Sequence, residues 1–172
     1  MKKAFTMIEL IFVIVILGIL AAVALPKFIG VSSQAHEANL KNFVGTLNGT
    51  LGPSWWSKAM PSGGDVSTLD INTTDELKKY TDLPKELSSW NLNNCNDANN
   101  YKVIGEGNTS VIGSTENYYI ICKDGAANYA PKFMLIKTAQ ADTLSLGDAN
   151  TSAPSGTSIG MEGNISATIV QQ

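Results

Sequence analysis

Glu9 poses the clearest chemical problem in this sequence, because it is a single acid inside a long apolar stretch. Residues 5–25 carry no other charge, and their number matches the roughly 20 residues that a helix needs to cross a bilayer. A carboxylate at the centre of a bilayer costs roughly 3 kcal/mol by the more lenient insertion scales. Glu9 therefore needs either a cationic partner inside the apolar layer or a position near the headgroups at the membrane surface.

Two cysteines, Cys95 and Cys122, lie far from the apolar stretch. If this part of the chain is outside the cytoplasm, they predict a disulfide. Closing a loop of about 28 residues would stabilise the fold by roughly 3–4 kcal/mol in the chain-entropy model. The alternative is two separate buried thiols.

The remaining residues do not suggest an enzyme. His36 is the only histidine, and there is no Ser/His/Asp set, metal-ligand cluster or phosphate-binding loop, so no catalytic residue is predicted. His36 is better explained as a solvated or lateral packing residue on a helix. The net charge is −3 and all twelve cationic side chains are lysines. Without the arginine fork that grips phosphate and guanine, no specific nucleic-acid partner is expected.

The apolar stretch has two interpretations. Lys2 and Lys3 precede it, and this bias predicts a cytoplasmic N-terminus with the rest of the chain outside. A removable signal peptide would use residues 10–20 as its apolar region and 22–24 as its cleavage site. However, a signal peptide gains nothing from Glu9, and the helical pattern continues well beyond residue 24.

That continuation predicts one long helix with an apolar stripe. Apolar residues recur at spacings typical of a helix, namely Phe28, Val31, Ala35, Ala38, Leu40, Val44, Leu47 and Leu51. A helix over residues 5–51 would be about 70 Å long. Pro53 is suited to the first turn of a short following helix.

The segment Ala4-Phe5-Thr6-Met7-Ile8-Glu9-Leu10 resembles the processing site of type IV pilins and of type II secretion pseudopilins. The match continues through Gly18, Pro26 and Phe28 and covers about the first 30 residues. It combines a cut site, an acid, an apolar span and a proline, which makes it a specific signature for so short a segment.

The resemblance implies that a prepilin peptidase cuts between Ala4 and Phe5 on the cytoplasmic side and N-methylates the new Phe5 amine. The family usually has glycine before the cut, so Ala4 departs from its pattern. Alanine is the smallest change available, and we expect processing to survive at a lower rate. Glu9 then becomes the fifth mature residue, buried beside the Phe5 amine of a neighbouring subunit. A charge pair buried together costs far less than either charge alone, so Glu9 would set the register of a polymer. The alternative is that Glu9 only reaches the inner headgroups.

Gly18 and Pro26 are candidates for a kink. Proline inside a helix removes a hydrogen bond and costs about 3 kcal/mol. In filaments of the family that this chain resembles, the helix between these positions is kinked or locally melted. The simpler alternative is that Pro26 ends the membrane segment.

The rest of the chain predicts an α+β head, in which the long helix packs on a small antiparallel sheet. A capping box is expected at Thr73 and Glu76, and residues 82–90 are predicted as a short helix. Strands are predicted at residues 101–104, 118–122, 132–136 and 165–170, with an exposed loop over 143–160. The predicted organisation is a leader (1–4), a transmembrane and filament-core helix (5–26), an amphipathic helix (27–52) and an extracytoplasmic head (53–172).

Two further chemistries are open in the head. Five N-x-S/T triplets occur, and four of them have an acid two residues before the asparagine, at Asn72, Asn108, Asn150 and Asn164. This resembles the extended acceptor motif of some bacterial oligosaccharyltransferases, whereas the triplet at Asn48 lacks the acid. Asp142 and Asp148 are candidate calcium ligands, because some pseudopilins bind calcium near the C-terminus. A solvated loop is the alternative, and no other cofactor is expected.

The sequence thus predicts a structural subunit that polymerises through its N-terminal helix into a type IV pilus or a type II secretion pseudopilus. Its expected partners are copies of itself, the peptidase, an inner-membrane assembly platform and, before assembly, lipid. Its expected location is the inner membrane, followed by an extracellular pilus or a periplasmic pseudopilus. The alternative is an exported or singly anchored binding module that never polymerises.

Overall fold

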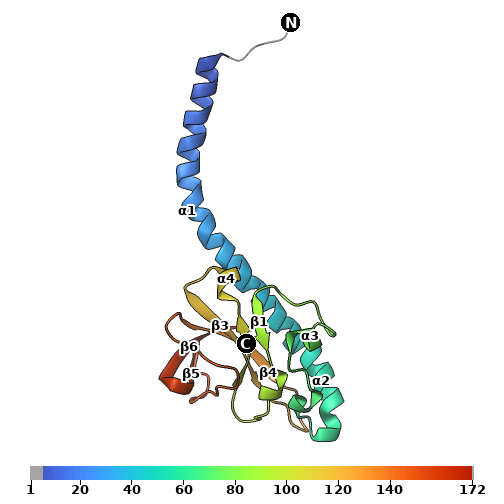
Figure 1. Ribbon diagram of the computed structural model, residues 1–172. Helices are drawn as coiled ribbons and strands as arrows, with labels where there is room; N and C mark the ends of the chain where they lie inside the picture. The colour runs from blue at the N-terminus through green and yellow to red at the C-terminus, as the bar shows by residue number, and fades with distance from the viewer. Residues whose placement is uncertain (1–5, 172) are drawn as a thin grey trace.

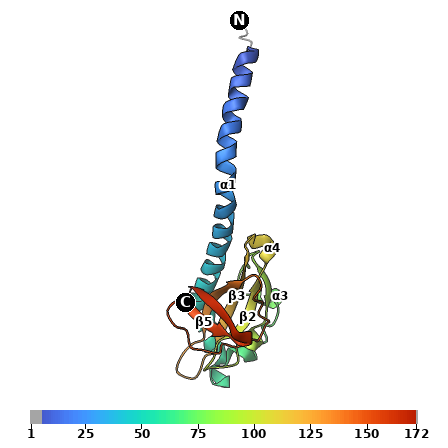
Figure 2. The same ribbon diagram turned by 90° about the vertical axis from the view of Figure 1, so that its left-hand side faces the viewer.

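A long helix dominates the fold. The computed structural model describes residues 6–171, with residues 25–30 described by their backbone only. Helix α1 (Met7–Thr46) runs for 40 residues, passes through one π-helical turn (Leu47–Leu51) and continues as α2 (Gly52–Ala59). Figures 1 and 2 show its N-terminal half projecting from the head as a free rod, while the other half lies against the head.

The π-helical turn joins α1 to α2 at the Gly52-Pro53 step. Pro53 stands in the first turn of α2, as the sequence predicts. A Cβ built on Gly52 would lie 2.9 Å from the Phe133 ring and 2.8 Å from the Leu47 carbonyl oxygen. Gly52 is therefore required for the close approach of the helix to the sheet.

The head is built on one six-stranded sheet. Its strands are β1 (Leu87–Trp90), β2 (Lys102–Gly107), β3 (Glu116–Lys123), β4 (Lys132–Ala139), β5 (Ser158–Met161) and β6 (Ile165–Gln171). Their order is β1-β2-β3-β4-β6-β5, and every neighbouring pair is antiparallel. The pairing of β3 with β4 runs without a register shift from Glu116↔Ala139 to Lys123↔Lys132. An α+β head with an antiparallel sheet is confirmed.

Short helical turns connect these strands. They are the 3-10 turns Met60–Ser62, Val66–Leu69, Leu92–Asn94 and Glu162–Asn164, together with α3 (Thr74–Leu77) and α4 (Thr109–Ile112). The predicted cap at α3 is confirmed, because the Glu76 N–H donates to Thr73 Oγ1 at 3.2 Å. The Glu76 carboxylate accepts from the Asn72 N–H, at 2.8 Å.

Two apolar clusters cover the two faces of the sheet. On the face against the helix, Trp55 is fully buried, with its ring centroid 6.5 Å from that of Trp90 and 6.4 Å from that of Phe133. Alternate residues of each strand point to opposite faces. Thus Tyr118, Ile120 and Cys122 of β3 join the cluster beneath the helix, whereas Tyr119 and Ile121 join the one that contains residues of β5 and β6.

The prediction of a helix over residues 82–90 is wrong, because Leu87–Trp90 forms strand β1. The start signal around Pro84 is local, whereas Leu87 and Trp90 are buried by pairing with β2 and by packing under the helix. The predicted loop over 143–160 also ends early, since Ser158–Met161 forms β5 by pairing with β6. In both cases tertiary contacts outweigh local preference.

Candidate functional site

Glu9 lies at the free tip of α1 and is held by Thr6. The Thr6 N–H and hydroxyl donate to Glu9 Oε2 at 2.9 and 2.7 Å, and the Glu9 N–H donates to Thr6 Oγ1 at 3.4 Å. These contacts form a capping box, which satisfies the first free N–H groups of the helix. The carboxylate is exposed at the tip rather than covered by the head.

The apolar half of α1 has no packing partner within the described chain. Met7–Ala24 is long and apolar enough to cross a membrane, and the head buries none of it. Large apolar side chains are exposed all along it, from 41% at Ile16 to 80% at Met7. A surface of this size in a single chain indicates burial in lipid, in other protein chains, or in each in turn.

The other predicted residues of this segment differ in how far the structure describes them. Ala4 and Phe5 lie outside the described residues. A Cβ built at Gly18 meets nothing within 4 Å, and α1 is continuous across both Gly18 and Pro26. Figure 1 shows α1 changing direction between its free half and the half on the head. A kink or melted turn within a filament stays a prediction.

Buried polar contacts attach α1 to the head. Glu86, which is 1% exposed, lies with Oε1 2.5 Å from His36 Nδ1 and accepts from Asn39 Nδ2 at 3.0 Å. Burial by itself would raise the pKa of Glu86, but the hydrogen bonds from Asn39 and His36 outweigh it and hold this pKa below its usual range. The carboxylate therefore stays charged while it joins α1 to the segment before β1.

Two more polar contacts continue this attachment along the helix. The Tyr118 hydroxyl donates to Glu37 Oε2 at 2.8 Å, and burial followed by this bond raises the pKa of Tyr118. Further along, the Asn48 amide pairs with the backbone of Phe133 at the start of β4, donating at 2.8 Å and accepting at 2.9 Å. The orientation of the rod on the head is thus fixed by specific contacts as well as by apolar packing.

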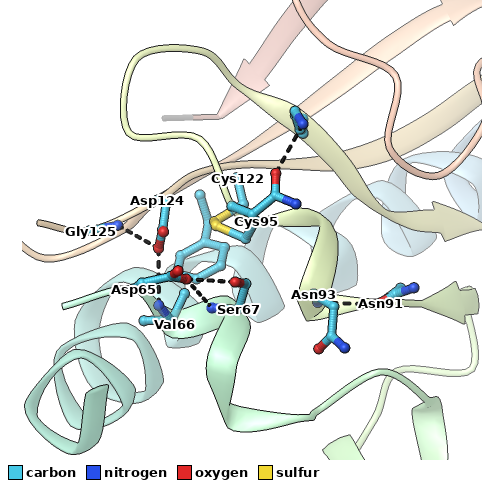
Figure 3. The surroundings of a disulfide bond; sticks show 12 residues. Asp65, Val66, Ser67, Asn91, Asn93, Cys95, Cys122, Asp124 and Gly125 are labelled. Atoms are coloured by element: carbon cyan, nitrogen blue, oxygen red, sulfur yellow. Dashed lines mark hydrogen bonds between the residues drawn. A yellow bond between two sulfur atoms is a disulfide. The ribbon is translucent and has the colours of Figure 1, made fainter. Parts of the chain in front are cut away.

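The disulfide predicted between Cys95 and Cys122 is present, and both residues are buried. Figure 3 shows Asp65 and Asp124 beside this bond. Asp124 Oδ1 accepts from the Val66 N–H at 3.1 Å and from the Gly125 N–H at 2.7 Å. Burial and the nearby Asp65 outweigh these two bonds and raise the pKa of Asp124 to about 7.

This shift predicts a pH-dependent stability. In the unfolded chain Asp124 ionises near pH 4, whereas in the folded chain it holds its proton until about pH 7. The folded state therefore binds more protons between these values, and the free energy of unfolding falls as the pH rises through them. We expect Asp124→Asn to be more stable than the wild type at pH 8, and the difference between the two proteins to be much smaller at pH 5.

Urea unfolding of both proteins at pH 5 and pH 8 measures this difference. Asparagine keeps the acceptor for Val66 and Gly125, so the comparison isolates the charge. Asp65→Asn is a matched second variant, because it removes the neighbouring charge and should lower the pKa of Asp124. If the free energy of unfolding changes between pH 5 and pH 8 by the same amount in the wild type and in Asp124→Asn, the raised pKa of Asp124 is contradicted.

The candidate calcium ligands have other contacts in the structure. Asp148 Oδ2 accepts from the Ser145 N–H at 2.7 Å, and the Asp142 backbone carbonyl accepts from the Thr138 hydroxyl at 2.5 Å. Over residues 6–171, no group of three or more His, Cys, Asp or Glu residues could hold a metal ion. Asp142 and Asp148 gain no support as a calcium site.

The four candidate acceptor asparagines lie in four different parts of the head. Asn72 precedes α3, Asn108 is the N-cap of α4, Asn150 lies in the long segment before β5, and Asn164 lies between β5 and β6. Asn72 and Asn164 are exposed, whereas Asn108 and Asn150 are half-buried. The structure therefore separates positions that look equivalent in the sequence.

Sequence reasoning missed Thr6 and Glu86. Thr6 could have been found, since Thr6-Met7-Ile8-Glu9 has the spacing of a capping box. Glu86 carries no such signal, because its partner His36 lies 50 residues away in the chain.

Comparison with known proteins identifies the N-terminal segment. Residues 1–25 match the family described as "Prokaryotic N-terminal methylation motif". The chain is also 55% identical over 38 residues to the type IV narrow pilus major component PilA5 of Thermus thermophilus. This alignment covers 22% of the chain and 33% of PilA5, so the chain matches about a third of the length of that relative. No solved structure matches the chain.

The N-terminal segment is thus similar to the N-terminal methylation motif of prokaryotic proteins. More specifically, it is similar to the N-terminal segment of a type IV pilus component. The resemblance to the pilin and pseudopilin family that the sequence predicts from Ala4 to Phe28 is confirmed.

Proposed function

We propose that this protein is the structural subunit of a helical filament and that it polymerises through the apolar half of α1. The single observation that carries the proposal is the rod Met7–Ala24, which the head leaves completely uncovered. Its sequence matches an N-terminal methylation motif, and its homologue is named as a type IV pilus component. A helix that serves only as an anchor would have no need of an acid at Glu9.

The chain passes through two environments in this proposal. The apolar helix first spans the inner membrane, with Lys2 and Lys3 on the cytoplasmic side and the head outside. Prepilin peptidase then removes residues 1–4 and methylates the Phe5 amine, and an assembly platform extracts the helix from lipid. Residues 5–26 form the filament core, residues 27–52 bridge to the head, and the head forms the surface.

Glu9 sets the register of the filament in this proposal. The Thr6 hydrogen bonds satisfy its carboxylate partly in the free chain, but they supply no positive charge. Burial in the apolar core therefore favours the arrangement in which the Phe5 amine of a neighbouring subunit lies beside the acid. The named relative favours a pilus over a secretion pseudopilus.

The mature N-terminus tests this proposal. We expect the chain recovered from sheared filaments to begin at Phe5 and to carry the extra mass of one methyl group. Ala4→Gly, which restores the residue usual in the family, should be processed at least as fast, while Ala4→Leu should accumulate uncut. Mass spectrometry of the filament and membrane fractions measures both results. A filament chain that begins at Met1, or one that has lost the apolar stretch, would exclude the proposed processing.

A further inference from the structure

The head carries an unexplained pattern of acceptor triplets. The chain has five N-x-S/T triplets, and the four that lie in the head all have an acid two residues before the asparagine, at Asp70, Glu106, Asp148 and Glu162. An asparagine side chain can be modified only if a partner reaches its Nδ2 atom and the amide is free to leave its own hydrogen bonds. The structure allows each triplet to be tested against that requirement.

Two of the five amides are fully engaged. Asn150 Oδ1 accepts from the Tyr101 N–H at 2.5 Å, and its Nδ2 donates to the Ser152 carbonyl at 2.7 Å. Asn48 pairs in the same two-sided way with the backbone of Phe133. Modification of Asn150 Nδ2 would break its bond to Ser152 beside the Oδ1 contact with Tyr101. Modification of Asn48 Nδ2 would break the bond between the helix and β4, so both side chains are structural.

Asn108 is partly engaged. It is half-buried, and its Oδ1 accepts from the Val111 N–H at 3.3 Å as the N-cap of α4. Its backbone N–H also donates to the Glu86 carbonyl at 2.6 Å, which holds the segment close to the head. The approach to its Nδ2 is therefore restricted.

Asn72 and Asn164 are free. Both are exposed, and neither side chain makes a hydrogen bond with a residue in the described range 6–171. Asn164 has a φ of 61° in the turn between β5 and β6, the last two strands at one edge of the sheet. Asn72 precedes α3, which packs against β1 at the opposite edge. Their acids, Asp70 and Glu162, are exposed as well.

We propose that Asn72 and Asn164 are N-glycosylation acceptors for a lipid-pyrophosphate-linked oligosaccharide. In this reaction Nδ2 forms a bond to the anomeric carbon while the bond from that carbon to the pyrophosphate oxygen breaks. The lipid pyrophosphate leaves, and one amide proton passes to a base of the transferase and then to solvent. The exposed carboxylate two residues earlier offers a charge at fixed spacing to a cation of the transferase.

The inference rests on the proposed function in one respect, since it needs the head outside the cytoplasm. The test uses the full chain purified from its own cells, with intact mass and peptide mass spectra. We expect the intact mass to exceed that of the processed polypeptide by the mass of two glycans. Asn72→Gln and Asn164→Gln should each lose one of them, and the double variant should have the bare mass.

Second variants separate recognition from folding. Thr74→Ala and Ser166→Ala leave the asparagines intact and should each lose one glycan. Asp70→Asn and Glu162→Gln remove only the charge, and Glu162→Gln keeps the acceptor for the Ala149 N–H, so lost occupancy there would identify the acid as part of the motif. Thr50→Ala, in the engaged Asn48 triplet, is the matched control and should leave the glycan masses unchanged.

Two results would overturn the inference. One is a bare polypeptide mass for a chain whose head is cleaved by protease added to spheroplasts. This result would leave the proposed function intact, because the head would still lie outside the cytoplasm. The other is a glycan on Asn150, since this would mean that the folded amide contacts do not select the acceptors. A head that external protease cannot reach would instead overturn the proposed function together with this inference.

Discussion

Replacing Glu9 by lysine is expected to abolish filaments while the chain still inserts into the membrane. Lysine places a second cation beside the Phe5 amine and leaves both charges without a partner in the filament core. Removing one partner of a buried ion pair costs about 3–5 kcal/mol, which lowers incorporation at least roughly a hundredfold. Insertion survives because lysine near the end of a membrane helix can extend its ammonium group to the headgroups.

The measurement is the amount of chain in the sheared extracellular fraction relative to the membrane fraction. Two matched variants separate charge from helix capping. Glu9→Gln keeps an acceptor for Thr6 without the charge and should also assemble poorly. Thr6→Val removes the hydroxyl bonds but keeps the charge, so it should assemble. Normal filaments from Glu9→Lys would contradict the proposed role of Glu9.

Loss of the disulfide is expected to produce the largest effect on the stability of the head. Cys95 and Cys122 are 27 residues apart in sequence, and closing a loop of that length stabilises a fold by roughly 3–4 kcal/mol in the chain-entropy model. We expect the double variant Cys95→Ala, Cys122→Ala to lose about this much free energy of unfolding, out of a typical total of about 5–15 kcal/mol.

Urea unfolding of the detergent-solubilised chain measures the loss. The wild type with its disulfide chemically reduced is the matched comparison, because it lacks the cross-link but keeps both side chains. The reduced protein and the double variant should unfold at similar urea concentrations. If the reduced protein and the double variant unfold at the same urea concentration as the oxidised wild type, the disulfide has no stabilising role.

The N-terminal half of the fold could be predicted from the sequence because its signals are local and strong. Residues 5–25 are almost uninterrupted in their apolar character, and the stripe from Phe28 to Leu51 repeats at helical spacing. The structure shows one rod through Ala59, with the expected helix start at Pro53. The burial of Trp55 in the core depends on tertiary contacts that no local pattern encodes.

The sheet could be predicted only in its centre. The strands predicted at residues 118–122 and 132–136 lie within β3 and β4. Those predicted at 101–104 and 165–170 fall on β2 and β6, so the four inner strands are all found. By contrast, β1 and β5 have four residues each and contain serine or glycine. They form because they pair with β2 and β6, and pairing between separate segments cannot be predicted from a short sequence window.

The candidate site, like the fold, could be predicted only in part. Glu9 could be found from its chemistry, since a lone acid in an apolar stretch demands an explanation. The attachment of α1 to the head could not, because the contact of His36 with Glu86 and that of Asn48 with Phe133 join residues far apart in the chain. The acceptor triplets were visible in the sequence, but only the structure distinguishes the free Asn72 and Asn164 from the engaged Asn150.

A helical reconstruction of the native filament by electron cryomicroscopy tests the central claim most directly. We expect a core made of the apolar segment Met7–Ala24 from many subunits. In that core, each Glu9 carboxylate should lie within about 4 Å of the Phe5 amine of a neighbour, the usual limit for an ion pair. A filament that is joined through the heads, or one in which Glu9 faces solvent away from every Phe5 amine, would contradict the proposed assembly.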